Sequence, residues 1–116
     1  MALAHANIGE PWDVRPLGSA IAGARSSALF KSAQLEVIRL VLPAGKGMPE
    51  HRVAGEITIH CLEGALAVDA LGARRSLVAG ELLFLPPGEP HAVEAVEDCS
   101  ALVTIVLAGP PGAGGA

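Results

Sequence analysis

The most informative stretch of this sequence is Gly80-Glu-Leu-Leu-Phe-Leu-Pro-Pro-Gly-Glu-Pro-His91. A glycine at its start permits a turn, and the apolar run at 82–85 has the length of a short buried strand. Pro86-Pro87-Gly88 then forces a rigid reversal in which Gly88 can take a positive φ. The spacing therefore predicts a strand, a tight turn and a histidine, His91, that is held in a fixed direction.

This spacing resembles the second sequence signature of the cupin family, Gly-x5-Pro-x-Gly-x2-His-x3-Asn, whose histidine is a metal ligand inside a small β-barrel. The chain matches it at every position except the last, where Ala95 replaces the asparagine. With the upstream signature described next, the resemblance covers about residues 35–107. It implies an all-β fold, the single-domain double-stranded β-helix, or jelly-roll barrel, of cupins.

The first cupin signature, Gly-x5-His-x-His followed by a glutamate and then a glycine, is present upstream in incomplete form. Gly45, His51 and Gly64 occupy their expected positions. Val53 stands at the position of the second histidine and Ile57 at that of the glutamate. The resemblance therefore supports the fold and implies that only two of the four usual metal ligands, the signature histidines, are kept.

Short apolar segments separated by turn residues run through most of the chain. Such a pattern, with no longer helical pattern between the segments, predicts an all-β sandwich or barrel. No internal repeat is visible, which indicates one barrel and not two fused ones. The expected strands are 28–32, 35–42, 57–62, 65–70, 74–78, 82–85, 91–96 and 101–107.

The 116 residues predict one domain, large enough to fold without a disulfide or a structural metal. Residues 1–18 are expected to form an N-terminal arm, either packed across the barrel or loose, because termini are mobile unless something ties them down. Residues 19–108 are expected to form the barrel. Residues 109–116 are rich in glycine and proline and are expected to be a flexible tail.

Charge and composition exclude several classes of partner. The net charge is −4, no Lys/Arg cluster is present, and aromatic residues make up 3% of the chain. Nucleic acids and anionic membranes both require a positive surface, so neither is expected as a partner. No apolar segment has the length of a membrane span. We expect a soluble protein with a small-molecule ligand or substrate, and a homodimer in which exposed strand edges pair with a second copy.

The two cysteines, Cys61 and Cys99, do not have CxxC spacing, and the first residues do not read as a secretory signal. We therefore expect free, buried thiols in a reducing cytoplasm. The sequence therefore predicts a cytoplasmic location.

Two histidines alone make a weak metal site, and His60 is the candidate for a third ligand. Side chains alternate across a strand, so Glu56 and His60 share one face while Ile57 lies on the other. In the usual cupin register Ile57 points into the cavity and His60 away from it. A one-residue shift at the turn 53–55 would reverse this arrangement. We favour the shifted register, because it recovers polar groups next to the position where the carboxylate is lost.

His51, His60 and His91 would then present three imidazoles to a divalent transition metal: Fe, Mn, Ni, Zn or Cu. The resemblance implies a small metal-binding cupin, with a metal-dependent enzyme of dioxygenase or isomerase type as the first hypothesis. The alternative is a non-catalytic cupin that binds or senses a small ligand with a degenerate metal site. A metal-free sugar epimerase ranks last, because the chain has no tyrosine to donate a proton.

Overall fold

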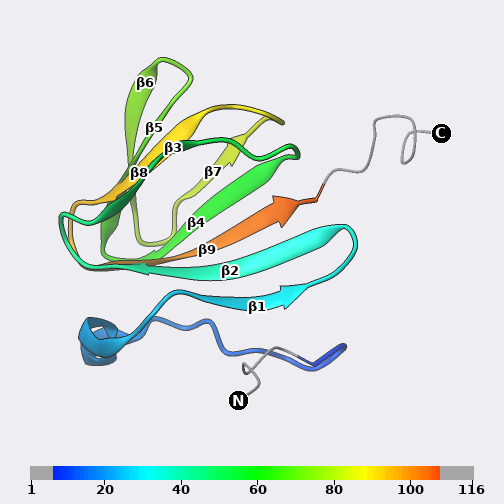
Figure 1. The fold of residues 1–116 in the computed structure, drawn as a ribbon. Coiled ribbons are helices and arrows are strands. Elements are labelled where there is room, and N and C mark those ends of the chain that lie inside the picture. Colours follow the sequence, from blue (N-terminus) through cyan, green and yellow to red (C-terminus); the bar gives the residue numbers. More distant parts are fainter. Residues whose placement is uncertain (1–6, 108–116) are drawn as a thin grey trace.

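The computed structural model describes residues 7–107 and contains two antiparallel sheets (Figure 1). The five-stranded sheet has the strand order β1-β2-β9-β4-β7, and the four-stranded sheet has the order β3-β8-β5-β6. This arrangement confirms the expected all-β jelly-roll architecture. The elements in chain order are η1 (Gly18–Gly23), β1 (Ser27–Lys31), β2 (Leu35–Leu42), β3 (Gly47–His51), β4 (Ile57–Glu63), β5 (Ala65–Ala70), β6 (Ala73–Val78), β7 (Leu82–Leu85), β8 (His91–Ala95) and β9 (Cys99–Val106).

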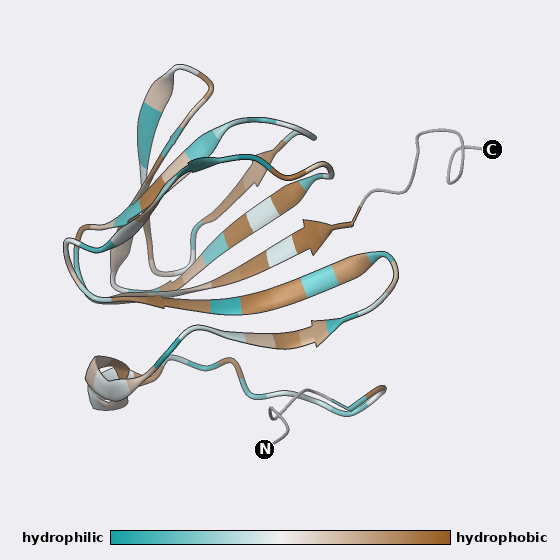
Figure 2. Cartoon of the chain, in the orientation of Figure 1, coloured by the Kyte–Doolittle hydropathy of each residue, from teal (hydrophilic) through white to brown (hydrophobic). Residues whose placement is uncertain are grey.

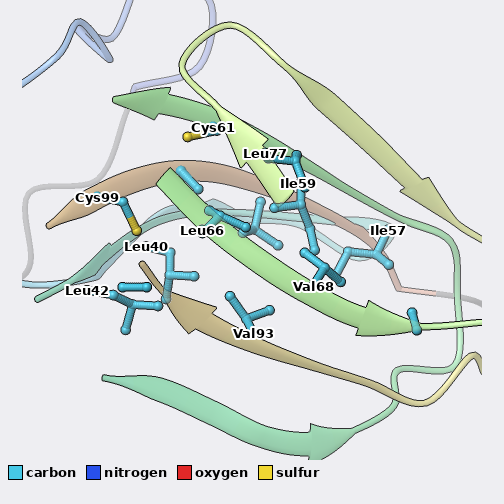
Figure 3. Packing of buried hydrophobic residues seen from close by; sticks show 14 of the residues in the cluster. Leu40, Leu42, Ile57, Ile59, Cys61, Leu66, Val68, Leu77, Val93 and Cys99 are labelled. Carbon is cyan, nitrogen blue, oxygen red and sulfur yellow. The ribbon is translucent and has the colours of Figure 1, made fainter. Parts of the chain in front are cut away.

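The hydrophobic core lies between the two sheets, and alternation along each strand supplies it (Figure 3). β4 illustrates the rule, because its odd-numbered apolar residues are buried while Thr58 and His60 between them are partly exposed. β2, β4 and β9 are mostly hydrophobic along their length, with isolated polar bands (Figure 2). The buried cluster comprises Leu40, Leu42, Ile57, Ile59, Cys61, Leu66, Val68, Ala70, Leu77, Leu85, Val93, Ala95, Cys99, Ala101 and Val103.

The turn before His91 has the expected form. Gly88 has φ +73°, in the left-handed region that favours glycine. Its backbone N–H donates to the carbonyl oxygen of Val53 at 2.9 Å, which ties this turn to the loop after β3. The two signature stretches are therefore joined by a main-chain hydrogen bond next to the two signature histidines.

Two elements were not expected from the sequence. The 3-10 helix η1 occupies Gly18–Gly23, where no period suggested an element. The strand β3 spans Gly47–His51, a stretch read only as part of the first signature. The other strands match their expected ranges to within two residues at either end.

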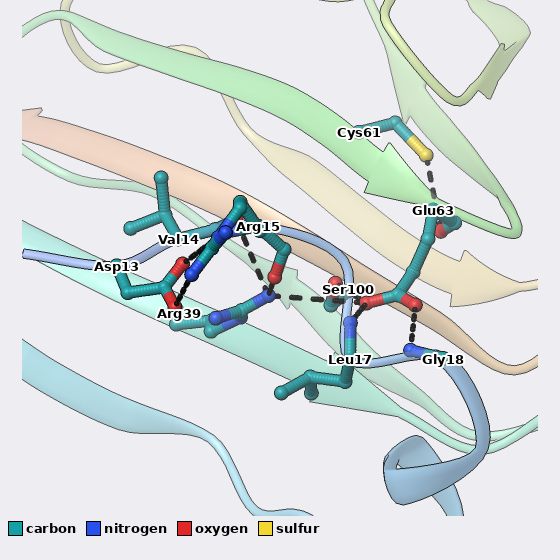
Figure 4. A network of polar contacts seen from close by, with 9 residues as sticks. All are labelled: Asp13, Val14, Arg15, Leu17, Gly18, Arg39, Cys61, Glu63 and Ser100. Carbon is teal, nitrogen blue, oxygen red and sulfur yellow. Dashed lines mark hydrogen bonds and ion pairs between the residues drawn. The ribbon is translucent and has the colours of Figure 1, made fainter.

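The segment before η1 crosses the outer face of the five-stranded sheet (Figure 4). The Arg39 guanidinium of β2 donates to the carbonyl oxygens of Val14 and Arg15. The Glu63 carboxylate, at the end of β4, accepts hydrogen bonds from the backbone N–H groups of Leu17 at 2.8 Å and Gly18 at 3.0 Å. Within residues 7–107 the arm is thus tied down by polar contacts to two strands of the sheet.

The tail expected at 109–116 and the first six residues of the arm lie outside the described residues. Within the described part of the chain, no helix has both the length and the apolar character that crossing a bilayer requires.

Candidate functional site

A β-bulge in β3 places the first site residues. Met48 lies opposite Val93 of β8, and His51 lies opposite His91. Three steps on β3 thus match two steps on β8, so β3 carries one extra residue in a segment that includes Pro49. Side chains three positions apart on a regular strand point to opposite faces, but the bulge turns both Met48 and His51 inward. Pro49 suits this position, because proline has no N–H to donate to the ladder.

The two signature histidines meet across this strand pair. The ring centroids of His51 and His91 are 4.3 Å apart, and the ring planes are tilted by 57°. In His51, Nδ1 lies 3.0 Å from the carbonyl oxygen of Pro49, and in His91, Nδ1 lies 3.0 Å from that of Glu89. A carbonyl oxygen can only accept, so in both rings Nδ1 carries the proton. Both Nε2 atoms are left with a lone pair when the imidazoles are neutral.

A small apolar cavity surrounds the two rings. His91 is 1% exposed, and His51 is half-buried. The cavity has a volume of about 60 Å³. Pockets for drug-sized ligands typically measure about 300–1,000 Å³, so this one has room for an ion with a few water molecules and not for a large metabolite. Its lining consists of His51, His91 and the apolar residues Ile38, Leu40, Met48, Ile57, Ile59, Val93, Val103 and Ile105.

The structure has the usual register on β4, so the expected one-residue shift is wrong. Ile57 and Ile59 line the cavity, whereas His60 lies on the opposite face of β4. It is paired there with Leu82 of β7 and Leu102 of β9. The reason is energetic: the shifted register would turn a wholly apolar row outward and bury polar side chains in the core.

A close backbone approach also fixes β4 in this register. A Cβ atom on Gly55, just before β4, would lie 1.9 Å from the carbonyl oxygen of Val106. The Val106 N–H in turn donates to the carbonyl oxygen of Glu56 at 2.9 Å. Gly55 therefore seats the start of β4 tightly against β9. Glu56, the carboxylate considered alongside His60, is exposed and is absent from the cavity lining.

The residues present do not fit the four-ligand metal site that the signatures describe. His51 and His91 fit as ligands, because backbone carbonyls orient both rings and leave Nε2 free. Val53 and Ile57, at the other two ligand positions, carry no lone pair. Within residues 7–107, no group of three or more His, Cys, Asp or Glu side chains is arranged to hold a metal ion.

Met48 is the site residue that the sequence reasoning did not recognise as a donor. Strand alternation counted from His51 places it on the outer face, and only the bulge brings its thioether to the cavity wall. Pro49 alone does not indicate the bulge, since a proline within a strand is also tolerated at a sheet edge, and β3 is an edge strand.

The two cysteines belong to the core and not to the site. Cys61 and Cys99 are buried and free, and neither lines the cavity. Burial raises the pKa of the Cys61 thiol. Burial, together with the charge of Cys61, raises the pKa of Cys99 to about 11. Both thiols are therefore protonated at neutral pH and are poor nucleophiles and poor metal ligands.

Comparison with known proteins places the fold in a family. Residues 38–107, more than half of the chain, match the family model described as "Cupin domain". The chain is a cupin. No curated protein matches this cupin.

Solved structures agree with this assignment. A cupin superfamily protein from Desulfitobacterium hafniense is 21% identical with a TM-score of 0.74, over 89% of this chain and 100% of that chain. An RmlC-like cupin from Desulfovibrio desulfuricans is 27% identical with a TM-score of 0.70, over 84% and 98% of the two chains. The DMSP lyase DddQ from Ruegeria pomeroyi is 25% identical with a TM-score of 0.65, over 80% of this chain and 52% of that chain.

Proposed function

We propose that this cupin is a binding module that holds one metal ion at the Nε2 atoms of His51 and His91. The observation that carries the proposal is the paired Nδ1 contact. Each ring uses Nδ1 to donate to a backbone carbonyl oxygen at 3.0 Å, which leaves Nε2 as the free nitrogen of two rings that line the same cavity. Metal-binding histidines are held in the same way, since the second nitrogen fixes the tautomer and the ring orientation.

The size and lining of the cavity favour binding over turnover. A volume of about 60 Å³ accepts an ion with a few waters but little of an organic substrate. Apart from the two imidazoles, every side chain in the lining is apolar. General acid–base chemistry requires a positioned proton donor and acceptor near the substrate, and the lining supplies only imidazoles. Catalysis on a large metabolite has little support in such a site.

A metal-dependent enzyme, of dioxygenase or isomerase type, is the second candidate. Two observations favour it: the free Nε2 pair, and the similarity at 25% identity to a structure described as a DMSP lyase. In this case the substrate or water would complete the coordination that Val53 and Ile57 do not provide. The ion would then supply Lewis-acid or redox chemistry to a bound small molecule.

The test of the proposed function is elemental analysis of the purified protein after loading with Fe, Mn, Ni, Zn or Cu and removal of free metal. The wild type is expected to retain about one metal ion per chain. His51→Ala and His91→Ala are each expected to lose it, because each removes one of two imidazoles.

His60→Ala is the matched control, since it removes a histidine that lies on β4 and faces away from the cavity. Full metal retention by His91→Ala, or no retention by the wild type with any of the five metals, would contradict the proposal. An organic reaction accelerated by the loaded protein and lost in His91→Ala would move the enzyme candidate to first place.

A further inference from the structure

The donor atoms around the cavity carry information about which ion the site prefers. Of the ten lining residues, three present a lone pair that can bind a metal: Met48, His51 and His91. None of the ten has an oxygen-bearing side chain. The position that the cupin signature gives to a glutamate is occupied by Ile57, which is 4% exposed and lines the cavity. The donor set is therefore nitrogen and sulfur only.

Met48 lies within reach of the histidine pair. Because of the bulge, Met48 and His51 face the interior together, and the Met48–Val93 pair is the next inward-facing pair along β3 and β8 after His51–His91. Diagonal neighbours on one face of an antiparallel pair are about 7–8 Å apart, a gap that long side chains span. Methionine is unbranched and has three rotatable bonds, so its thioether can turn toward the two rings.

The missing carboxylate matters because the lining is apolar and His91 is 1% exposed. All three donor groups are neutral, so a bound cation keeps its full charge among aliphatic side chains. The cost of transferring an ion from water into such surroundings grows with the square of its charge, which makes a dication roughly four times as costly as a monocation. Neutral donors without a carboxylate therefore favour an ion of charge +1.

Ligand softness points the same way. Thioether and imidazole donors suit Cu(I), whereas Mg²⁺, Ca²⁺ and Mn²⁺ prefer oxygen donors. Cu(I) is also satisfied by two or three ligands, which is the number available here. We infer that the site selects Cu(I), which is bound by His51 and His91 with Met48 as the third donor. This inference rests on the proposed function.

Competition for Cu(I) tests this inference. The full-length protein is titrated anaerobically with Cu(I) in the presence of bicinchoninate, a coloured Cu(I) chelator, and separately with Zn²⁺ against a zinc chelator. The wild type is expected to bind one Cu(I) per chain and to prefer Cu(I) over Zn²⁺. Met48→Leu keeps the volume and removes the sulfur. It is expected to weaken Cu(I) binding by at least roughly tenfold, since even groups that only support a metal ligand are worth about 10–100-fold.

The affinity for Zn²⁺ is expected to stay unchanged in Met48→Leu, and His60→Ala serves again as the control. Copper X-ray absorption of the loaded wild type gives a second measurement, in which a Cu–S contribution lost in Met48→Leu is expected. Equal Cu(I) affinity in Met48→Leu and wild type, or a preference for Zn²⁺, would overturn the inference and leave the proposed function in place. No binding of either ion by the wild type would overturn both.

Discussion

His51 and His91 use the same local device on two different strands. Each ring donates through Nδ1 to the backbone carbonyl oxygen of the residue two positions before it. The pairing of β3 with β8 brings the two ring centroids to 4.3 Å from each other. Local backbone geometry sets the tautomer, and strand pairing sets the distance. A two-histidine site of this kind needs no other side chain to orient it.

Ile57→Glu tests the importance of the missing carboxylate. Ile57 is 4% exposed and faces the cavity. We expect the variant to unfold at a lower temperature than the wild type in the absence of metal, because a buried unpaired carboxylate is costly. Zn²⁺ is expected to restore much of the lost stability, since a carboxylate and two imidazoles form a suitable divalent site. Thermal unfolding with and without Zn²⁺ measures this, and Ile57→Gln is the neutral control. Identical responses to Zn²⁺ in the Glu and Gln variants would contradict the prediction.

At the scale of single residues, the sequence predicted the site only in part. The Pro-x-Gly-x2-His spacing identified His91, because a rigid turn directly before a strand aims its first residue. The prediction that His60 faces the cavity was wrong. It gave more weight to recovering polar metal ligands than to burying the apolar row that contains Ile57 and Ile59. Met48 was not recognised, because a bulge depends on how two strands pair and not on alternation within one of them.

At the scale of elements, the arm is held by a small polar network. Burial alone raises the pKa of the Glu63 carboxyl, but hydrogen bonds from the Leu17 N–H, the Ser100 hydroxyl and the Gly18 N–H, with the Arg39 charge, outweigh it. The net effect lowers the pKa of Glu63 below its ordinary value. A depressed pKa means that the carboxylate stabilises the folded state above the unfolded pKa, and that this contribution is lost as the pH falls toward the folded pKa.

Glu63→Gln tests this network. At pH 7 we expect the variant to be less stable by about 1–3 kcal/mol, the range for hydrogen bonds to charged groups and for buried groups left unsatisfied. Below the ordinary glutamate pKa the wild type gradually loses the same contribution, so the difference between the two proteins is expected to shrink. Urea unfolding at a series of pH values measures it, with Glu97→Gln at an exposed position as the control. A difference that grows toward acid pH would refute the assignment.

Strand boundaries were largely predictable, and the first elements were not. The ranges of β2, β5 and β7 match the expected ones, because Gly or Pro lies close to both ends of β5 and β7 and Pro43 directly follows β2. The start of helix η1 is held by a long-range contact, because the N–H of Gly18 donates to the carboxylate of Glu63 at the end of β4. A contact across 45 residues leaves no local signal in the sequence.

At the scale of the whole molecule, the outer face of the five-stranded sheet carries exposed apolar side chains at its β7 edge, away from the part that the arm crosses. Leu82 and Phe84 of the edge strand β7 are 64% and 55% exposed. The outward-facing residues next to them on β4 and β9 are Thr58, His60, Leu102 and Thr104, and none of these is an Asp, Glu, Lys or Arg. The chain has a net charge of −4, so this face is one on which two copies can meet without like-charge repulsion. We expect the homodimer to form through it.

Phe84→Glu tests the dimer, because it places a charge in the centre of the expected contact on both copies. Light scattering at micromolar concentration is expected to give a dimer mass for the wild type and a monomer mass for the variant. Val78→Glu is the matched control, since Val78 is similarly exposed but lies on the four-stranded sheet. A monomeric wild type, or a Phe84→Glu variant that stays dimeric, would rule out this interface.

We propose that His51 and His91 present their Nε2 atoms to one bound ion. This arrangement can be tested by nitrogen NMR of the histidine side chains, recorded before and after Cu(I) is added in the absence of oxygen. Before the addition both rings are expected in the Nδ1–H tautomer, and after it both Nε2 signals are expected to shift while those of His60 stay in place. An Nε2–H tautomer in either ring of the metal-free protein, or a Cu(I)-induced shift at His60 and not at His51 and His91, would rule out a shared ion at these two Nε2 atoms.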